Sequence, residues 1–178
     1  MLDDVKNRDM IPAWVDGKLT PVEKLDVHKR GLRHKAVSVF VMRGKDVLIQ
    51  RRALGKYHTP GLWANTCCTH PLWGEDPAIC AVRRLDEELG ITGLVPAHKG
   101  HIEYRADVGN DLIEHEAVEV FVADVHGPLH IAPNPDEVME TRWISIYDLA
   151  AEADRWPDRF TPWLRIYLRD HMDAIFAT

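Results

Sequence analysis

Short runs of β-branched and aromatic residues, separated by turn residues, recur along the first four fifths of the chain and predict β-strands. The dipeptide Asp16-Gly17 lies between the first two runs and predicts a tight hairpin near the N-terminus. The predicted strands are 11–15, 18–22, 36–42, 46–51, 64–68, 101–107, 112–124 and 141–145. We therefore expect a sheet at the centre of the fold.

The clearest helix is predicted between Asp76 and Gly90. Asp76 is a favourable N-cap, Pro77 suits the first helical position, and Gly90 is a typical C-terminal stop. The apolar residues that recur at helical spacing are Ala78, Ile79, Val82, Leu85 and Leu89. On such a helix Arg84 and Glu88 lie one turn apart, on one flank of this apolar stripe.

Two further helices are predicted near the C-terminus. One begins near Ser145, whose spacing to Asp148 resembles a capping box, and the other begins at Thr161-Pro162. The apolar face of the second is Trp163, Leu164, Tyr167, Leu168 and Met172. Strands dominate and helices are few, so the expected fold class is α/β in the broad sense (α+β), a mixed sheet between helices with an N-terminal β-hairpin.

Length and composition indicate the number of domains and the cellular compartment of the protein. A chain of 178 residues fits one domain, 1–178, in which we expect residues 1–10 to be loosely ordered. No run approaches the roughly 18 apolar residues of a membrane helix, and MLDDVKNRDM lacks a signal-peptide pattern. The three cysteines, two of them adjacent, make a poor disulfide framework and suit a reducing compartment. We expect a cytoplasmic monomer without a membrane partner.

The charge of the chain is unevenly distributed. The net charge of -6 disfavours binding to nucleic acid, which is a polyanion. Residues 24–56, however, carry ten Lys or Arg and two acids, a net charge of +8 that leaves -14 for the other 145 residues. Such a segment suits a small anion such as a phosphate ester, and a solvated basic surface explains it equally well.

Two carboxylates are predicted to point toward the core. In the run LIEHEAVEVFV, Glu114 and Glu116 share a strand face with Val118, Val120 and Val122, and three valines indicate that this face is buried. Burying ionised carboxylates costs several kcal/mol unless they are paired or bind a metal. The alternative is that the start of the strand is solvated.

Further candidate ligands lie in NTCCTHP and HKRGLRH. Cys68 and His70 face the same way in an extended chain, and His28 and His34 flank the basic residues. Three imidazoles and two carboxylates would suit Mn²⁺, Zn²⁺ or Fe²⁺ better than Mg²⁺ or Ca²⁺. A buried cysteine is more often inert than reactive. We interpret the other histidines as surface residues: His58, His98, His101, His115, His126, His130 and His171.

The predicted helix also carries a phosphate-associated motif. RRLDEELGI fits the Nudix box G-x5-E-x7-R-E-U-x-E-E-x-G-U, in which U is a bulky apolar residue. The matching residues are Glu75, Arg83, Glu87, Glu88 and Gly90. Thr69 replaces the first glycine of the box and Arg84 replaces the first helix glutamate. An arginine at that position would weaken the binding of several Mg²⁺ ions and add a clamp for phosphate, so diphosphate binding is favoured over hydrolysis.

Together with this box, the segments NTCCTHP, EYRADVG, IEHE and TPWLRIY resemble the type 1 isopentenyl-diphosphate isomerases, a family with the Nudix fold. The similarity spans about residues 19–172. It implies a metal-dependent isomerase that interconverts isopentenyl and dimethylallyl diphosphate by protonation and deprotonation, in isoprenoid biosynthesis. Two alternatives stay open: a Nudix hydrolase of a small diphosphate, and a module in which Cys67, Cys68 and His70 hold a structural zinc.

The resemblance also implies roles for individual residues. The implied catalytic residues are Cys68, Glu116, Tyr104 and Trp163. The implied ligands of the substrate diphosphate are Lys24, Arg52, Lys56 and Arg84. The implied ligands of one divalent metal, Mn²⁺ or Zn²⁺ (or Mg²⁺), are His28, His34, His70, Glu114 and Glu116. A Mg²⁺ ion carried by the diphosphate is implied to bind Glu88 and the backbone carbonyl of Cys68.

Overall fold

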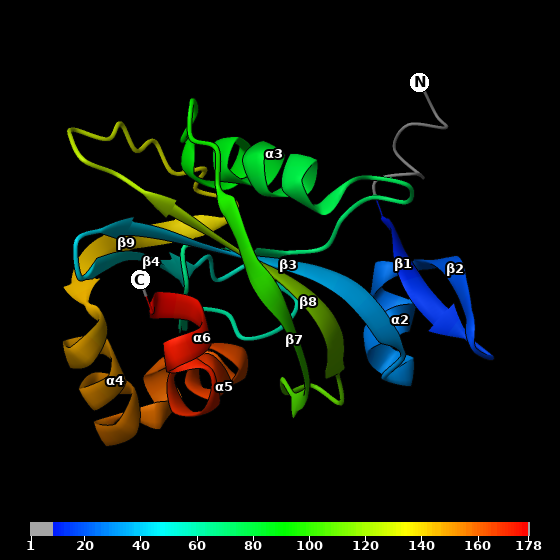
Figure 1. The fold of residues 1–178 in the computed structure, drawn as a ribbon. Coiled ribbons are helices and arrows are strands. Elements are labelled where there is room, and N and C mark those ends of the chain that lie inside the picture. The colour runs from blue at the N-terminus through cyan, green and yellow to red at the C-terminus, as the bar shows by residue number, and fades with distance from the viewer. Residues whose placement is uncertain (1–8, 178) are drawn as a thin grey trace.

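A computed structural model describes residues 9–177, in which one mixed sheet crosses the molecule with helices on both faces (Figure 1). The strands are β1 (Met10–Val15), β2 (Lys18–Glu23), β3 (Arg33–Arg43), β4 (Asp46–Arg52), β5 (Trp63–Ala64), β6 (Cys67–Thr69), β7 (Ala97–Asp107), β8 (Ile113–Asp124) and β9 (Val138–Ser145). The helices are α2 (Lys24–Arg30), α3 (Pro77–Leu89), α4 (Ile146–Arg155), α5 (Pro162–Asp170), α6 (Met172–Phe176) and the 3-10 turn η1 (Pro157–Arg159). The predicted fold class is confirmed.

Strand β3 is the centre of the sheet. It pairs in parallel with β8, in a register that sets His34 opposite Glu116 and Ser38 opposite Val120. It pairs antiparallel with β1, β4 and β6, while β7 pairs with β8 and β9 pairs with β4. Strands β3 and β4 pair at only two positions beside their turn, and farther along the short strands β5 and β6 pair with β4 and β3 respectively.

Both faces of β3 are buried, each against different helices. Ala36, Phe40 and Met42 belong to the core under α4, α5 and α6, whereas Val37, Val39 and Val41 belong to the core under α3. Figure 1 shows α3 on one side of the sheet and α4, α5 and α6 on the other. This two-sided burial explains why the run is apolar at nearly every position.

The local signals for turns and caps are confirmed. Asp16 and Gly17 both have positive φ, 49° and 76°, as expected for the hairpin between β1 and β2. The Asp76 carboxylate accepts a hydrogen bond of 2.8 Å from the Ala78 amide at the start of α3. The Ser145 hydroxyl accepts one of 3.0 Å from the Asp148 amide at the start of α4.

The predicted apolar stripe of α3 is wrong in part. Ala78 is exposed, Ile79 and Val82 are 63% and 42% exposed, and the buried face contains Cys80 and Ala81 together with Leu85 and Leu89. Small side chains at Cys80 and Ala81 let the helix approach β3 and β6 closely, and hydrophobicity at helical spacing does not reveal such a contact.

Other element boundaries also differ from the expectations. The run 64–68 splits into β5 and β6, because the intervening Thr66 side chain bonds to the backbone of both β3 and β4. Helix α2 is not predicted by the sequence pattern, and Met172 lies in α6 instead of α5. Met10 opens β1, and the expectation for residues 1–8 lies outside the described part of the chain.

Within residues 9–177 no helix combines the length and the apolar character needed to cross a membrane.

The end of α3 leads to a first testable prediction. Gly90 and Gly44 both have a φ of 61°, so alanine at either position incurs the same backbone strain, roughly 1–2 kcal/mol. Only at Gly90 would the new Cβ collide with neighbours, at 2.8 Å from the Ala132 carbonyl oxygen and 2.9 Å from its Cβ. Gly90→Ala should therefore lower the free energy of unfolding by roughly 1–3 kcal/mol more than Gly44→Ala. Urea unfolding followed by circular dichroism measures both, and equal losses would contradict the packing argument.

Candidate active site

A polar pocket lies near the ends of β3 and β4 that are remote from their shared turn. It is lined by Lys24, Arg52, Lys56, Tyr57, His58, Cys68, Thr69, His70, Arg84, Glu88, Glu114, Glu116 and Trp163. His28, His34 and Tyr104 are buried beneath these residues and contact them. The structure thus brings together every site residue that the sequence predicts, from α2 at one end of the chain to α5 at the other.

Three histidines and Glu116 form the core of the site. The His70 Nε2 atom lies 3.0 Å from Glu116 Oε1 and 3.2 Å from His34 Nε2, and the His28 ring centroid is 4.9 Å from that of His34. One ligand atom from each of these four residues lies within 4.8 Å of the other three. Such spacing is compatible with ligands around a single metal ion.

Backbone contacts orient two of these imidazoles. His28 Nδ1 lies 2.6 Å from the Lys24 carbonyl oxygen, and His34 Nδ1 lies 2.8 Å from the Leu32 carbonyl oxygen. A carbonyl can only accept, so each Nδ1 carries the hydrogen and each Nε2 keeps a free lone pair. Burial and the adjacent His34 lower the pKa of His28 to about 4, and burial also holds the pKa of His70 well below its usual range. Neutral imidazoles with free Nε2 atoms are the form that binds a metal.

Two carboxylates meet at one phenol. The Tyr104 hydroxyl lies 2.8 Å from Glu114 Oε2 and 2.8 Å from Glu116 Oε2, and it has one hydrogen to donate. Burial and the charge of Glu116 raise the pKa of Glu114 well above its usual range. Burial acts in the same sense on Glu116, but the adjacent imidazoles of His34 and His70 outweigh it and hold the pKa of Glu116 well below its usual range. A divalent cation among these donors would supply the positive charge that the buried pair lacks, so the donor set fits a metal.

The two adjacent cysteines face opposite sides of the sheet. Cys67 is fully buried in the core under α3, whereas Cys68 lines the pocket. The Cys68 Sγ atom lies 3.3 Å from Ser38 Oγ, which in turn lies 2.8 Å from the Tyr167 hydroxyl. Burial, reinforced by the Glu116 and Glu114 carboxylates, raises the pKa of Cys68 well above its usual range, so the group is a thiol.

Trp163 closes another side of the pocket. Its indole nitrogen donates a hydrogen bond of 3.2 Å to Asn65 Oδ1, which orients the ring. The Arg52 guanidinium lies 5.2 Å from the ring centroid, and the Arg52 Nε is buried without a hydrogen-bond partner among the described residues. A buried cation with an unused donor is available to an anionic ligand.

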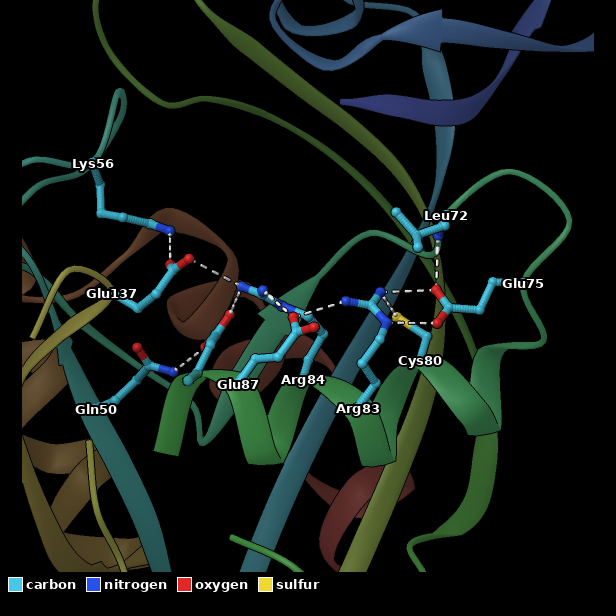
Figure 2. Close-up of polar contacts among 10 residues, drawn as sticks. Gln50, Lys56, Leu72, Glu75, Cys80, Arg83, Arg84, Glu87 and Glu137 are labelled. Carbon is cyan, nitrogen blue, oxygen red and sulfur yellow. Dashed lines mark hydrogen bonds and ion pairs between the residues drawn. The ribbon is translucent and has the colours of Figure 1, made fainter. Parts of the chain in front are cut away.

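Two of the pocket cations, Lys56 and Arg84, belong to a chain of ion pairs along α3 (Figure 2). Glu137 bonds both the Lys56 ammonium and, at 3.4 Å, the Arg84 guanidinium. Arg84 also bonds Glu87 at 2.7 Å and Glu88 at 2.6 Å. These carboxylates neutralise Lys56 and Arg84, whereas Lys24 and Arg52 form no ion pair with the described residues.

The Nudix-box residues at the other end of this chain have a structural role. Arg83 forms a two-pronged pair with Glu75, with N···O distances of 2.6 and 2.8 Å, and Glu75 accepts a hydrogen bond from the Leu72 amide (Figure 2). The pair ties α3 to the loop that precedes it. Glu88 turns the other way, and receives a hydrogen bond of 2.8 Å from Gln50 on β4.

The sequence pattern does not reveal several residues that line the pocket or contact its lining. His58 was expected on the surface, but its side chain is buried and its Nε2 lies 3.3 Å from Glu114 Oε1. Tyr57, Gln50 and Glu137 were not singled out at all. His58 and Glu137 lie outside helices and strands, so no periodicity indicates where their side chains point. The other histidines interpreted as surface residues are exposed or half-buried.

Comparisons with known proteins agree on family and fold. The NUDIX domain family matches residues 32–164. The isopentenyl-diphosphate Delta-isomerase of Dinoroseobacter shibae is 68% identical over 171 residues, covering 96% of this chain and 97% of that protein. The protein of the same name from Cereibacter sphaeroides is 69% identical over 169 residues, covering 95% and 96% of the two chains.

Solved structures resemble the chain in fold alone. A Deinococcus radiodurans protein superposes with a TM-score of 0.71 at 13% identity, covering 90% of this chain and 97% of that one. A MutT protein from Methanosarcina mazei superposes with a TM-score of 0.59 at 18% identity, covering 76% and 90%. Because the two isomerases match nearly the whole chain at 68% and 69% identity, the chain belongs to the isopentenyl-diphosphate Delta-isomerase family of NUDIX domain proteins.

Proposed function

We propose that this protein interconverts isopentenyl diphosphate and dimethylallyl diphosphate by moving a double bond, as the names of its relatives indicate for them. One observation supports this function above others: a protonated thiol, Cys68, and a buried carboxylate, Glu116, line the same pocket as four cationic side chains. Isomerisation needs such a pair of groups, because one proton is added to the substrate and another is removed.

In the proposed complex the cations hold the diphosphate. Lys24, Arg52, Lys56 and Arg84 all line the pocket, and a diphosphate would replace Glu137 as the partner of Lys56 and Arg84. Charge-assisted hydrogen bonds of this kind fix the orientation of the ligand as well as its affinity. The hydrocarbon part is thereby directed toward Cys68 and Glu116.

The proton transfers are assigned to Cys68 and Glu116. One of the two groups gives a proton to the double bond, which leaves a positive charge on the tertiary carbon. The other removes a proton from a neighbouring carbon, and the electrons of that C–H bond form the new double bond. Ser38 and Tyr167 hold the thiol in place, and Tyr104 holds Glu116. The face of the Trp163 ring would stabilise the intermediate cation by roughly 2 kcal/mol without reacting with it.

Two divalent metals are proposed to assist. Mn²⁺ or Zn²⁺ (or Mg²⁺) would bind to His28, His34, His70, Glu114 and Glu116, and a Mg²⁺ ion would bind to Glu88, the Cys68 carbonyl and the diphosphate. The metals would supply positive charge that tunes the acidity of Glu116 and neutralises the diphosphate. All of these residues come from one chain, so a monomer is sufficient, and the three free cysteines suit the cytoplasm.

Hydrolysis of a small diphosphate is the second candidate. Arg84 bonds Glu87, Glu88 and Glu137, so its guanidinium takes up carboxylate oxygens that a cluster of metal ions would need. We therefore rank hydrolysis below isomerisation.

The first activity test uses the two cysteines. Cys68→Ala should reduce turnover to background because it removes the proposed proton-transfer group, whereas Cys67→Ala, on the opposite face of the strand, should keep most of the activity. Glu116→Gln should also abolish turnover. The measurement is deuterium incorporation into dimethylallyl diphosphate from isopentenyl diphosphate and Mg²⁺ in heavy water. Full activity in Cys68→Ala would refute the role of the thiol, and release of phosphate by the native protein would favour the hydrolase.

The second activity test addresses Mg²⁺. Glu88→Gln and Glu87→Gln each remove one carboxylate partner of Arg84, but only Glu88 is a proposed Mg²⁺ ligand. Glu88→Gln should raise the Mg²⁺ concentration needed for half-maximal turnover by about tenfold or more, whereas Glu87→Gln should leave it close to the native value. Rates measured across a Mg²⁺ series decide the question, and equal shifts in both variants would assign the effect to Arg84 instead of the metal.

A further inference from the structure

A fourth histidine, His58, lies beside the proposed metal ligands. His58 lies between β4 and β5 and is only 3% exposed. Its Nδ1 atom is 3.0 Å from the Thr59 hydroxyl, and its backbone carbonyl accepts a hydrogen bond of 3.2 Å from Arg52. These contacts fix the ring so that Nε2 points to Glu114 Oε1, 3.3 Å away.

The carboxylates Glu114 and Glu116 have matching surroundings. Each gives its Oε2 atom to the Tyr104 hydroxyl. The Oε1 atom of Glu116 then faces the imidazoles of His34 and His70. The Oε1 atom of Glu114 faces one imidazole, that of His58. His58 therefore faces Glu114 in the same way that His34 and His70 face Glu116.

His28 joins the two halves. Its ring centroid is 4.9 Å from that of His34, 5.3 Å from that of His70 and 5.5 Å from that of His58. One ligand atom from each of His28, His58 and Glu114 lies within 4.8 Å of the other two, as is also true of the set formed by His28, His34, His70 and Glu116. The four imidazoles therefore surround one region of the pocket, with His28 common to both sets.

We propose that His58 is a further ligand of the metal held by His28, His34, His70, Glu114 and Glu116, which makes a centre of four imidazoles and two carboxylates. The inference rests on the metal centre described under the proposed function. A fourth nitrogen shifts the preference of the site away from Mg²⁺ and toward Co²⁺ and Zn²⁺. A role limited to packing against Trp163, whose ring lies 5.8 Å from that of His58, is the competing explanation.

The number of nitrogen ligands can be measured on the native protein by NMR. Protein labelled with ¹⁵N-histidine and loaded with ¹¹³Cd²⁺ should show four imidazole nitrogens split by one-bond coupling to cadmium. Coupling to three nitrogens would overturn the role of His58 and leave the metal centre intact. Coupling to none would overturn the metal centre as well, so the two failures are distinguishable.

A variant gives the independent energetic test. His58→Ala should weaken Co²⁺ binding, measured by competition with a chelator, by roughly 10- to 100-fold and shift the d–d absorption bands of the bound ion. His126→Ala, which removes an exposed histidine, is the matched control and should bind Co²⁺ as the native protein does. A native Co²⁺ affinity and spectrum in His58→Ala would overturn the proposal, because loss of packing alone predicts no change in the spectrum. If His58→Ala fails to fold, the cadmium experiment on the native protein decides alone.

Discussion

The parallel pairing of β3 with β8 is the constraint on which the pocket depends. Its register sets His34 opposite Glu116, so an imidazole from one strand and a carboxylate from the other share a face. A shift of one residue would turn Glu114 and Glu116 toward the core under α3 and leave His34 without them. Valines on the same face of β8 bury the strand and make such a shift costly.

The sequence predicts the parts of the site that lie on regular strands. Alternation along β8 correctly puts Glu114 and Glu116 on the buried face, and the family resemblance selects Cys68 over Cys67. The positions of His58 and Glu137 could not be predicted, because loops have no periodicity from which the direction of a side chain can be inferred. The error at Ile79 on α3 has another cause, since close contact through small residues outweighs hydrophobicity.

Electrostatics explains how one small pocket holds so many charges. Lys56 and Arg84 are partnered by Glu137, and Glu88 also bonds Arg84, so two of the four pocket cations are neutralised by carboxylates. Lys24 and Arg52 form no such ion pair with the described residues, and burial together with the neighbouring cations lowers the pKa of Lys24 to about 8. Partly buried cations that already have partners need little reorganisation when an anion takes the place of one carboxylate. The arrangement therefore favours ligands that bring both negative charge and a counter-cation, as a diphosphate with Mg²⁺ does.

The contact between Ser38 and Tyr167 links positions 129 residues apart, and it supports the pocket thiol at one end. All nine strands of residues 9–177 precede α5 in the chain. During synthesis, a chain that has just completed its sheet would still lack α5 and hence the support behind Cys68. Trp163 lies on the same helix, so α5 completes a pocket whose other lining residues all precede it in the chain.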